Sequence, residues 1–202
     1  AIIKANELAN LYSLDTISLG VAIAFGMECF ENEIWNTDDT GGVELKFGNA
    51  EAMLKMVEMI TRREGVGDIL AEGVKKASEK IGQGSEEWAV HVKGVELPMH
   101  DPRVKKGLGI IYSVEAHGAD HCAGMHDTAS TQENAGVEHL RGMGAILPLA
   151  ADDLSASKVA SQRASHLWSI FRDSMVCRQF VPWTIDQQAE IIRAITGWSY
   201  TT

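Results

Sequence analysis

The twelve residues from Ala116 to Asp127, AHGADHCAGMHD, concentrate side chains that could bind a metal or transfer a proton. Imidazole nitrogens and thiolates are common ligands of transition metals, and histidine also exchanges protons near neutral pH. Three interpretations are open: a metal site built on His117, His121, His126 and Cys122, a catalytic site, or a polar loop rich in small residues. His117 and His121 would share one face of a helix, but Gly118 between them argues against a regular helix.

Three other segments carry chemistry of their own. Asp15 in NLYSLDTIS either caps a helix or marks backbone amides that bind an anion or a polar ring. Arg103 in HDPRVKK belongs to a basic turn that suits a phosphate or is a solvated surface. Cys177 in FRDSMVCRQF is either a thiolate favoured by the neighbouring Arg178 or a buried, inert thiol.

The elements that must position these residues are mainly helical. Apolar spacing predicts helices over 3–12, 16–30 and 50–63, the last capped by Asn49 and followed by Gly65 as its C′ residue. One helix is predicted from Asp68 to Gly82, a short strand within 88–97, an irregular glycine-rich segment over 98–148, and a helix over 155–176. Asp186 is predicted to cap the last helix, over 187–198.

Composition excludes several classes of protein. The 202 residues carry a net charge of −10, which disfavours nucleic-acid binding and an anionic membrane surface. No apolar run reaches the roughly 20 residues that span a bilayer. Three widely spaced cysteines do not form a disulfide framework, which predicts a cytoplasmic location. The chain starts without Met on a helical pattern, as expected of a piece of a longer protein.

Six segments, in this order, resemble the tungsten-dependent aldehyde ferredoxin oxidoreductase family. The resemblance runs from Ile2 to the closing ITGWSYTT. The matching segments are SLDTISLG, REGVGDILAEG, VKGVELPMHDPR, KGLGIIYS, GADH and RDSMVC.

This resemblance implies a mostly α fold with at most a short strand or hairpin. It divides the chain into portions of two helical domains, residues 1–97 and 98–202, and implies that the family's N-terminal β domain lies outside it. Members oxidise aldehydes to carboxylic acids at a tungsten or molybdenum ion held by two molybdopterin-type pterins. A 4Fe-4S cluster passes the electrons to ferredoxin. The fragment alone is expected to be inactive and to lack its cofactors.

The resemblance also assigns roles to residues. Paired D-x-x-G-L-[CD] motifs bind the pterins. The first falls on residues 10–15, where Leu14 and Asp15 match while Asn10 and Ser13 replace Asp and Gly. The second falls on 173–178, where Asp173 matches and Val176 precedes Cys177, one place early for the cluster ligand; either Cys177 ligates the cluster or the ligand is missing.

Two further residues are assigned through the resemblance. His121 ends the GADH segment and is the implied catalytic residue, polarising the substrate carbonyl. Arg103 is grouped with the cofactor-binding residues.

Assembly and substrate leave alternatives open. The family's E-x-x-H pair for an iron across a dimer interface falls on Lys4 and Glu7 here, so a homodimer would form without that iron. Instead of an aldehyde oxidoreductase, the protein could be a tungsten subunit that reduces aromatic thioesters. It could also be a non-enzymatic His-rich metal-binding module, or a helical scaffold whose polar turns are only caps.

Overall fold

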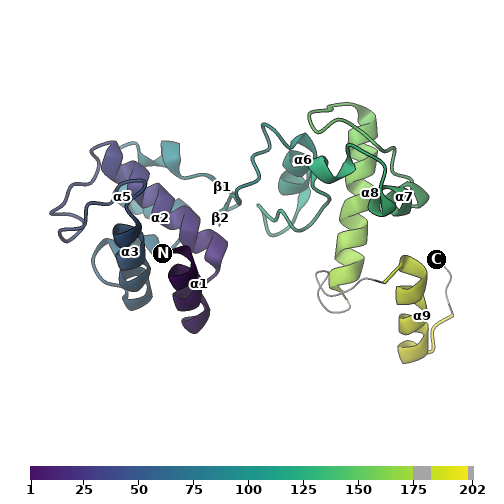
Figure 1. Ribbon diagram of the computed structural model, residues 1–202, viewed down its shortest axis with the longest axis horizontal. Coiled ribbons are helices and arrows are strands. Elements are labelled where there is room, and N and C mark those ends of the chain that lie inside the picture. Colours follow the sequence, from purple (N-terminus) through teal and green to yellow (C-terminus); the bar gives the residue numbers. More distant parts are fainter. Residues whose placement is uncertain (175–182, 200–202) are drawn as a thin grey trace. The chain divides into compact units, whose positions relative to one another are not determined.

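The computed structural model describes residues 1–174 and 183–199, and it is mainly helical (Figure 1). The prediction of a mostly α chain with at most a hairpin is confirmed. No helix in this part of the chain is long and apolar enough to cross a membrane. The α-helices are α1 (Ile2–Leu11), α2 (Thr16–Glu31), α3 (Ala50–Arg62), α4 (Val66–Leu70), α5 (Val74–Ile81), α6 (Lys106–Val114), α7 (Ala135–Gly142), α8 (Ala156–Asp173) and α9 (Ile185–Thr196).

The chain divides into two compact units. The first unit consists of residues 1–101 and 112–121, and the second of residues 102–111 and the described residues from 122 onward. The division at residue 97 that the sequence suggested stays a prediction.

The core of the first unit forms around α2, whose residues are apolar on most of its faces. Gly26 of α2 lets Leu70, Leu45 and Trp35 approach closely, since a Cβ there would lie 3.1–3.4 Å from their side chains. Where α4 crosses α3, Gly67 lies so close to Met59 that an added Cβ would be 2.3 Å from the Met59 carbonyl carbon. Small residues therefore set the distances between these helices.

Helix boundaries in the first unit follow the predicted caps in part. Asn49 accepts the Ala52 amide at 3.1 Å and caps α3, as predicted. Arg63 follows the last residue of α3 and takes the left-handed conformation, so the prediction of Gly65 as the C′ residue is wrong; Gly65 is the N-cap of α4 instead. The single helix predicted from Asp68 is also wrong, because the chain turns at Gly73 (φ 82°) and forms α4 and α5 separately.

The predicted strand is a two-stranded antiparallel hairpin, β1 (His91–Val92) and β2 (Val95–Glu96). Lys93 and Gly94 connect the strands, and both have positive φ, as a two-residue type I′ turn requires. A 3₁₀ turn, η1 (Ser85–Trp88), precedes the hairpin.

The segment from Pro98 to Pro148 is less irregular than its sequence suggested. It contains α6, α7 and a second 3₁₀ turn, η2 (Asp127–Ser130). In the second unit it packs on α8, which turns a stripe of buried polar side chains toward it. The stripe consists of Lys158, Ser161, Gln162, Ser165 and Ser169.

The stripe bonds mainly to the backbone of that segment. Ser161 Oγ bonds both the amide and the carbonyl of Ile146. Gln162 donates to the Met125 carbonyl, and the Met125 amide donates to Ser165. These bonds replace the regular secondary structure that the glycine-rich sequence does not form.

The last helix, α9, starts two residues earlier than predicted. Thr184 accepts the Gln187 amide and Gln187 bonds back to the Thr184 amide, forming a capping box. Thr184 therefore caps the helix, and the prediction of Asp186 is wrong because a hydroxyl with a glutamine three residues on satisfies two amides at once.

Candidate functional site

The junction between α1 and α2 is built from backbone geometry. The amide of Leu14 donates to the Ala9 carbonyl at 2.8 Å and that of Ser13 to the Asn10 carbonyl at 3.3 Å, which is the Schellman pattern of helix ends. Ser13 has a φ of 57°, a conformation that glycine adopts most easily. This is the position where the resembled motif has glycine, so the backbone conformation fits the alignment even though the residue differs.

Asp15 lies at the start of α2, as predicted for a cap. Its Oδ1 accepts the Ser18 amide at 2.7 Å. The side chain of Asn10 turns back along α1, where its amide donates to the Asn6 carbonyl at 2.8 Å. The junction thus presents Leu14 and the first turn of α2, while Asn10 bonds to its own helix.

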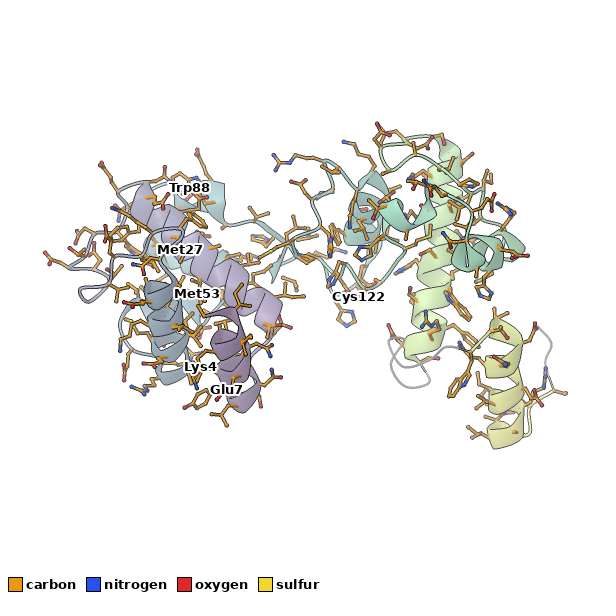
Figure 2. The ribbon with its side chains drawn as sticks, in the orientation of Figure 1. Lys4, Glu7, Met27, Met53, Trp88 and Cys122 are labelled. Atoms are coloured by element: carbon orange, nitrogen blue, oxygen red, sulfur yellow. The ribbon has the colours of Figure 1, made fainter. Side chains whose placement is uncertain are left out.

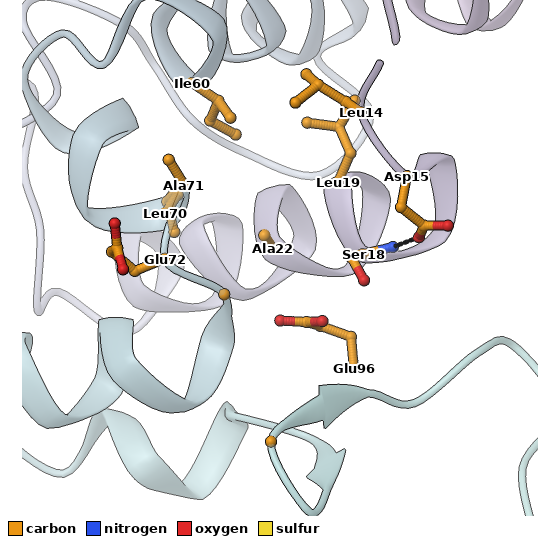
Figure 3. A pocket seen from close by; sticks show the side chains of 12 residues that line it. Leu14, Asp15, Ser18, Leu19, Ala22, Ile60, Leu70, Ala71, Glu72 and Glu96 are labelled. Carbon is orange, nitrogen blue, oxygen red and sulfur yellow. Dashed lines mark hydrogen bonds between the residues drawn. The ribbon is translucent and has the colours of Figure 1, made fainter. Parts of the chain in front are cut away.

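A cavity of about 300 Å³ opens beside this junction (Figure 3). Its size lies at the lower end of small-molecule sites. Three parts of the first unit converge on it: the start of α2, the link between α4 and α5, and the hairpin. The lining residues are Leu14, Asp15, Ser18, Leu19, Ala22, Ile60, Leu70, Ala71, Glu72, Gly73, Gly94 and Glu96.

Two glutamates line the cavity in different environments. Glu72 is exposed and pairs with Arg63 at 2.6 Å and Lys76 at 3.3 Å; the Arg63 hydrogen bond lowers the pKa of the Glu72 carboxyl. Glu96 is only 5% exposed, and its Oε1 accepts the Val74 amide at 2.8 Å. A side chain at Gly73 would put a Cβ 2.6 Å from that oxygen, so glycine admits the carboxylate.

His121 lies in the first unit in a turn, not on a helix, as Gly118 indicated. Its ring lies 4.9 Å from that of His100, with 30° between the planes. His117 is exposed, and its Nδ1 lies 3.1 Å from Glu115 Oε1. The two histidines therefore do not form one helical face.

The hairpin fixes the backbone that leads to His121. Lys93 donates to the carbonyls of Ser113 and Glu115, at 3.2 and 2.6 Å, where α6 ends. Gly118 (φ 102°) lies against Val92, since a Cβ there would be 2.2 Å from the Val92 carbonyl oxygen. The same hairpin thus supplies Glu96 to the cavity and supports the GADH segment.

Three consecutive residues place possible metal ligands close together. The ligand atoms of Asp120, His121 and Cys122 lie within 4.8 Å of one another. In the described part of the chain, this group contains neither His117 nor His126. His126 lies 3.0 Å from Lys105 through its Nδ1.

The other predicted site residues are placed as follows. Arg103 is exposed in the turn before α6, and Asp173 is exposed at the last position of α8. Val176 and Cys177 lie outside the described residues, so their roles stay predictions. Lys4 and Glu7 form an exposed ion pair of 3.0 Å on α1 (Figure 2).

Sequence reasoning missed Glu96 and gave His100 no role beyond a rigid polar turn. Glu96 is a charged residue within a predicted strand, VKGVEL, and no local pattern showed that it would be buried. His100 meets His121 only through the fold. The available signal was a carboxylate among apolar strand residues, which in a buried strand needs a partner.

Comparison with known proteins agrees with the family resemblance seen in the sequence. The family described as "Aldehyde ferredoxin oxidoreductase, domains 2 & 3" matches residues 1–202. A tungsten-containing aldehyde ferredoxin oxidoreductase of Pyrococcus horikoshii is 40% identical over 124 residues, which cover 60% of this chain and 20% of the relative.

Two proteins of Pyrococcus furiosus are also similar. A tungsten-containing aldehyde ferredoxin oxidoreductase is 37% identical over 122 residues, covering 60% of this chain and 20% of the relative. An aliphatic sulfonate oxidoreductase, WOR-like subunit, is 34% identical over 126 residues, covering 59% and 20%. The chain matches about a fifth of the length of these relatives.

Proposed function

The chain belongs to the aldehyde ferredoxin oxidoreductase family, over its domains 2 and 3, and on that premise we propose that it forms part of a tungsten enzyme that oxidises aldehydes to carboxylic acids. In this proposal the cavity beside the α1–α2 junction holds one pterin of the metal cofactor. Cys177 binds the 4Fe-4S cluster, from which ferredoxin takes the electrons.

The junction is the observation that carries the proposal. Leu14 and Asp15 match the first pterin motif, and Ser13 adopts the left-handed conformation at the motif's glycine position. The cavity of about 300 Å³ opens directly beside these residues, so the motif lies at a site with room for a bicyclic ring.

The residues that line the cavity suit a pterin ring. Leu14, Leu19 and Ala22 offer an apolar wall, and Asp15 and Glu96 contribute carboxylates. Bound there, the cofactor would supply the two-electron oxidation that protein side chains alone do not perform. The chain's own contribution is to bind and orient the ring.

His121 has the proposed catalytic role. A neutral imidazole donates an N–H to the aldehyde carbonyl oxygen and stabilises the negative charge that develops there. The His100 ring, 4.9 Å away, restricts the orientation of the His121 ring.

The complete polypeptide, produced with tungstate, tests this function. We expect aldehyde-dependent reduction of a low-potential viologen dye, and His121→Ala to lower kcat by about 10²–10⁴-fold, since positioned acid–base groups contribute that much. Tungsten content should not change. His117→Ala is the matched control, because His117 is exposed and paired with Glu115.

Two results would contradict the proposal. One is a tungsten-loaded protein that oxidises no aldehyde; the substrate panel includes an alkane sulfonate because one relative is named for that substrate. The other is tight stoichiometric zinc binding without tungsten, which would favour a metal-binding module at Asp120, His121 and Cys122.

A further inference from the structure

Glu96 is a buried carboxylate with few hydrogen bonds. Its Oε1 accepts one bond, from the Val74 amide at 2.8 Å, and no residue in the described part of the chain bonds to its Oε2. An ionised carboxylate has about four acceptor positions. The Oε2 atom is not among the fully buried polar atoms that lack a partner, so a molecule in the cavity can reach it.

Asp127 in the second unit shows how this chain satisfies another buried carboxylate. It is fully buried and accepts the amides of Gly107 and Leu108, at 3.0 and 3.2 Å. Its Oδ1 also lies 2.6 Å from Lys158 Nζ. Three donors thus surround Asp127, whereas Glu96 has one and faces a cavity.

In Figure 3 the Glu96 side chain extends from the hairpin into the space beside α2, with its carboxylate turned toward the link between α4 and α5, where Oε1 accepts the Val74 amide. The other two carboxylates of the lining are exposed: Asp15 also accepts one amide, that of Ser18, and Glu72 pairs with Arg63 and Lys76. Among the three carboxylates of the lining, Glu96 is therefore the buried one, and its second oxygen is left for a ligand.

A ligand that complements Glu96 needs two N–H donors side by side on a flat edge, as a guanidinium presents to a carboxylate. The amino-pyrimidinone edge of a pterin has this arrangement, with a ring N–H next to an exocyclic amino group. We propose that Glu96 binds this edge of the pterin, an inference that rests on the proposed function and assigns a specificity residue within it.

Titration of the complete polypeptide, produced without tungstate and free of cofactor, with free pterin, followed by fluorescence, tests the inference without any enzyme activity. Glu96→Gln should weaken binding by about tenfold or more, because a charge-assisted hydrogen bond is lost. The glutamine oxygen can still accept the Val74 amide, so the fold should persist; circular dichroism checks this. Glu79→Gln, at an exposed position of α5 outside the lining, is the control and should change the Kd by less than about twofold.

A second ligand makes the test independent of any variant. Lumazine has the pterin ring system with a carbonyl in place of the amino group, so the unaltered chain should bind it about tenfold more weakly or worse. Equal binding of lumazine and pterin, or unchanged binding by Glu96→Gln, would overturn the role of Glu96 and leave the cofactor site standing. If the unaltered chain binds no pterin, the proposed cofactor site fails and the inference fails with it.

Discussion

At the scale of single residues, the second unit depends on one buried ion pair. Lys158 and Asp127 are 1% and 0% exposed in their side chains, and 2.6 Å separates their charged atoms. Lys158 also donates to the Ala150 carbonyl at 2.8 Å, and Asp127 caps the first amides of α6. The pair therefore joins α8 to two other segments of the unit.

Lys158→Met should lower the free energy of unfolding by about 3–5 kcal/mol, because it leaves the Asp127 carboxylate buried without a cation. The double variant Asp127→Asn with Lys158→Met should recover part of this loss, since no unpaired charge remains. Urea denaturation of the two single variants and the double variant measures the coupling. Additive losses would show that the two charges do not interact.

The buried thiol of Cys29 makes the free energy of unfolding depend on pH in the alkaline range. Burial, with a smaller effect of Glu28, raises the pKa of its thiol to about 12, from an ordinary value near 9. Because the unfolded chain loses this proton more easily, the contribution of Cys29 is complete below pH 9 and is lost between pH 9 and 12.

Cys29→Ala should flatten this part of the pH dependence of unfolding. Peptide mapping after alkylation at pH 8 gives a second measurement: Cys122, which is half-buried, should react before Cys29. Equal labelling of both thiols in the folded chain would contradict the burial of Cys29.

At the scale of elements, two glycines have opposite roles. Gly67 lies against the Met59 backbone, whereas a Cβ at Gly20 in α2 would meet nothing within 4 Å. Gly67→Ala should therefore destabilise the chain by about 1–3 kcal/mol through overpacking. Gly20→Ala should stabilise it by about 0.5–1 kcal/mol, since alanine loses less conformational freedom in a helix.

Thermal unfolding measures both effects: Gly67→Ala should lower the melting temperature, and Gly20→Ala should raise it. A Gly67→Ala variant as stable as the parent chain would show that α3 and α4 separate at little cost.

The elements also show what a sequence can predict. The helices α2 and α3 followed from apolar spacing, and Asp15 and Asn49 from cap chemistry, because these signals are local. The break at Gly73 was missed because the glycine is required by a residue 23 positions away, Glu96, whose carboxylate fills the space of its side chain.

The same distinction holds for the candidate site. Leu14, Asp15 and the non-helical turn at His121 could be predicted from motifs and from Gly118. The approach of His100 to His121 and the burial of Glu96 are tertiary properties, set by where the hairpin lies. The buried face of α8 could not be predicted either. Its residues are lysine, serine and glutamine at helical spacing, and a polar stripe of this kind usually faces water.

At the scale of the whole molecule, the two units have unlike cores. The first unit has a large apolar cluster around α2 and α3, and the second has a small one around Val137, Leu140 and Leu147. In the described part of the second unit, buried hydrogen bonds from the polar side chains of α8 also hold the neighbouring loops against this helix.

Hydrogen exchange should separate the two units. Amides of α2 and α3 should exchange more slowly than those of α7, since protection follows the apolar area that local opening exposes. Mass spectrometry of exchanged peptides measures the order. Equal protection in all three helices would indicate that the units open in one cooperative step.

The manner in which α8 holds the histidine-rich segment has an evolutionary consequence. Its bonds reach the main-chain atoms of Ala123, Met125 and Ile146, and the side chains of these residues take no part in them. Replacing these three side chains would thus leave the bonds in place, whereas Asp127 is tied to Lys158 and Gly124 lies against Ile111. New specificities could be sampled at such backbone-held positions without rebuilding the scaffold.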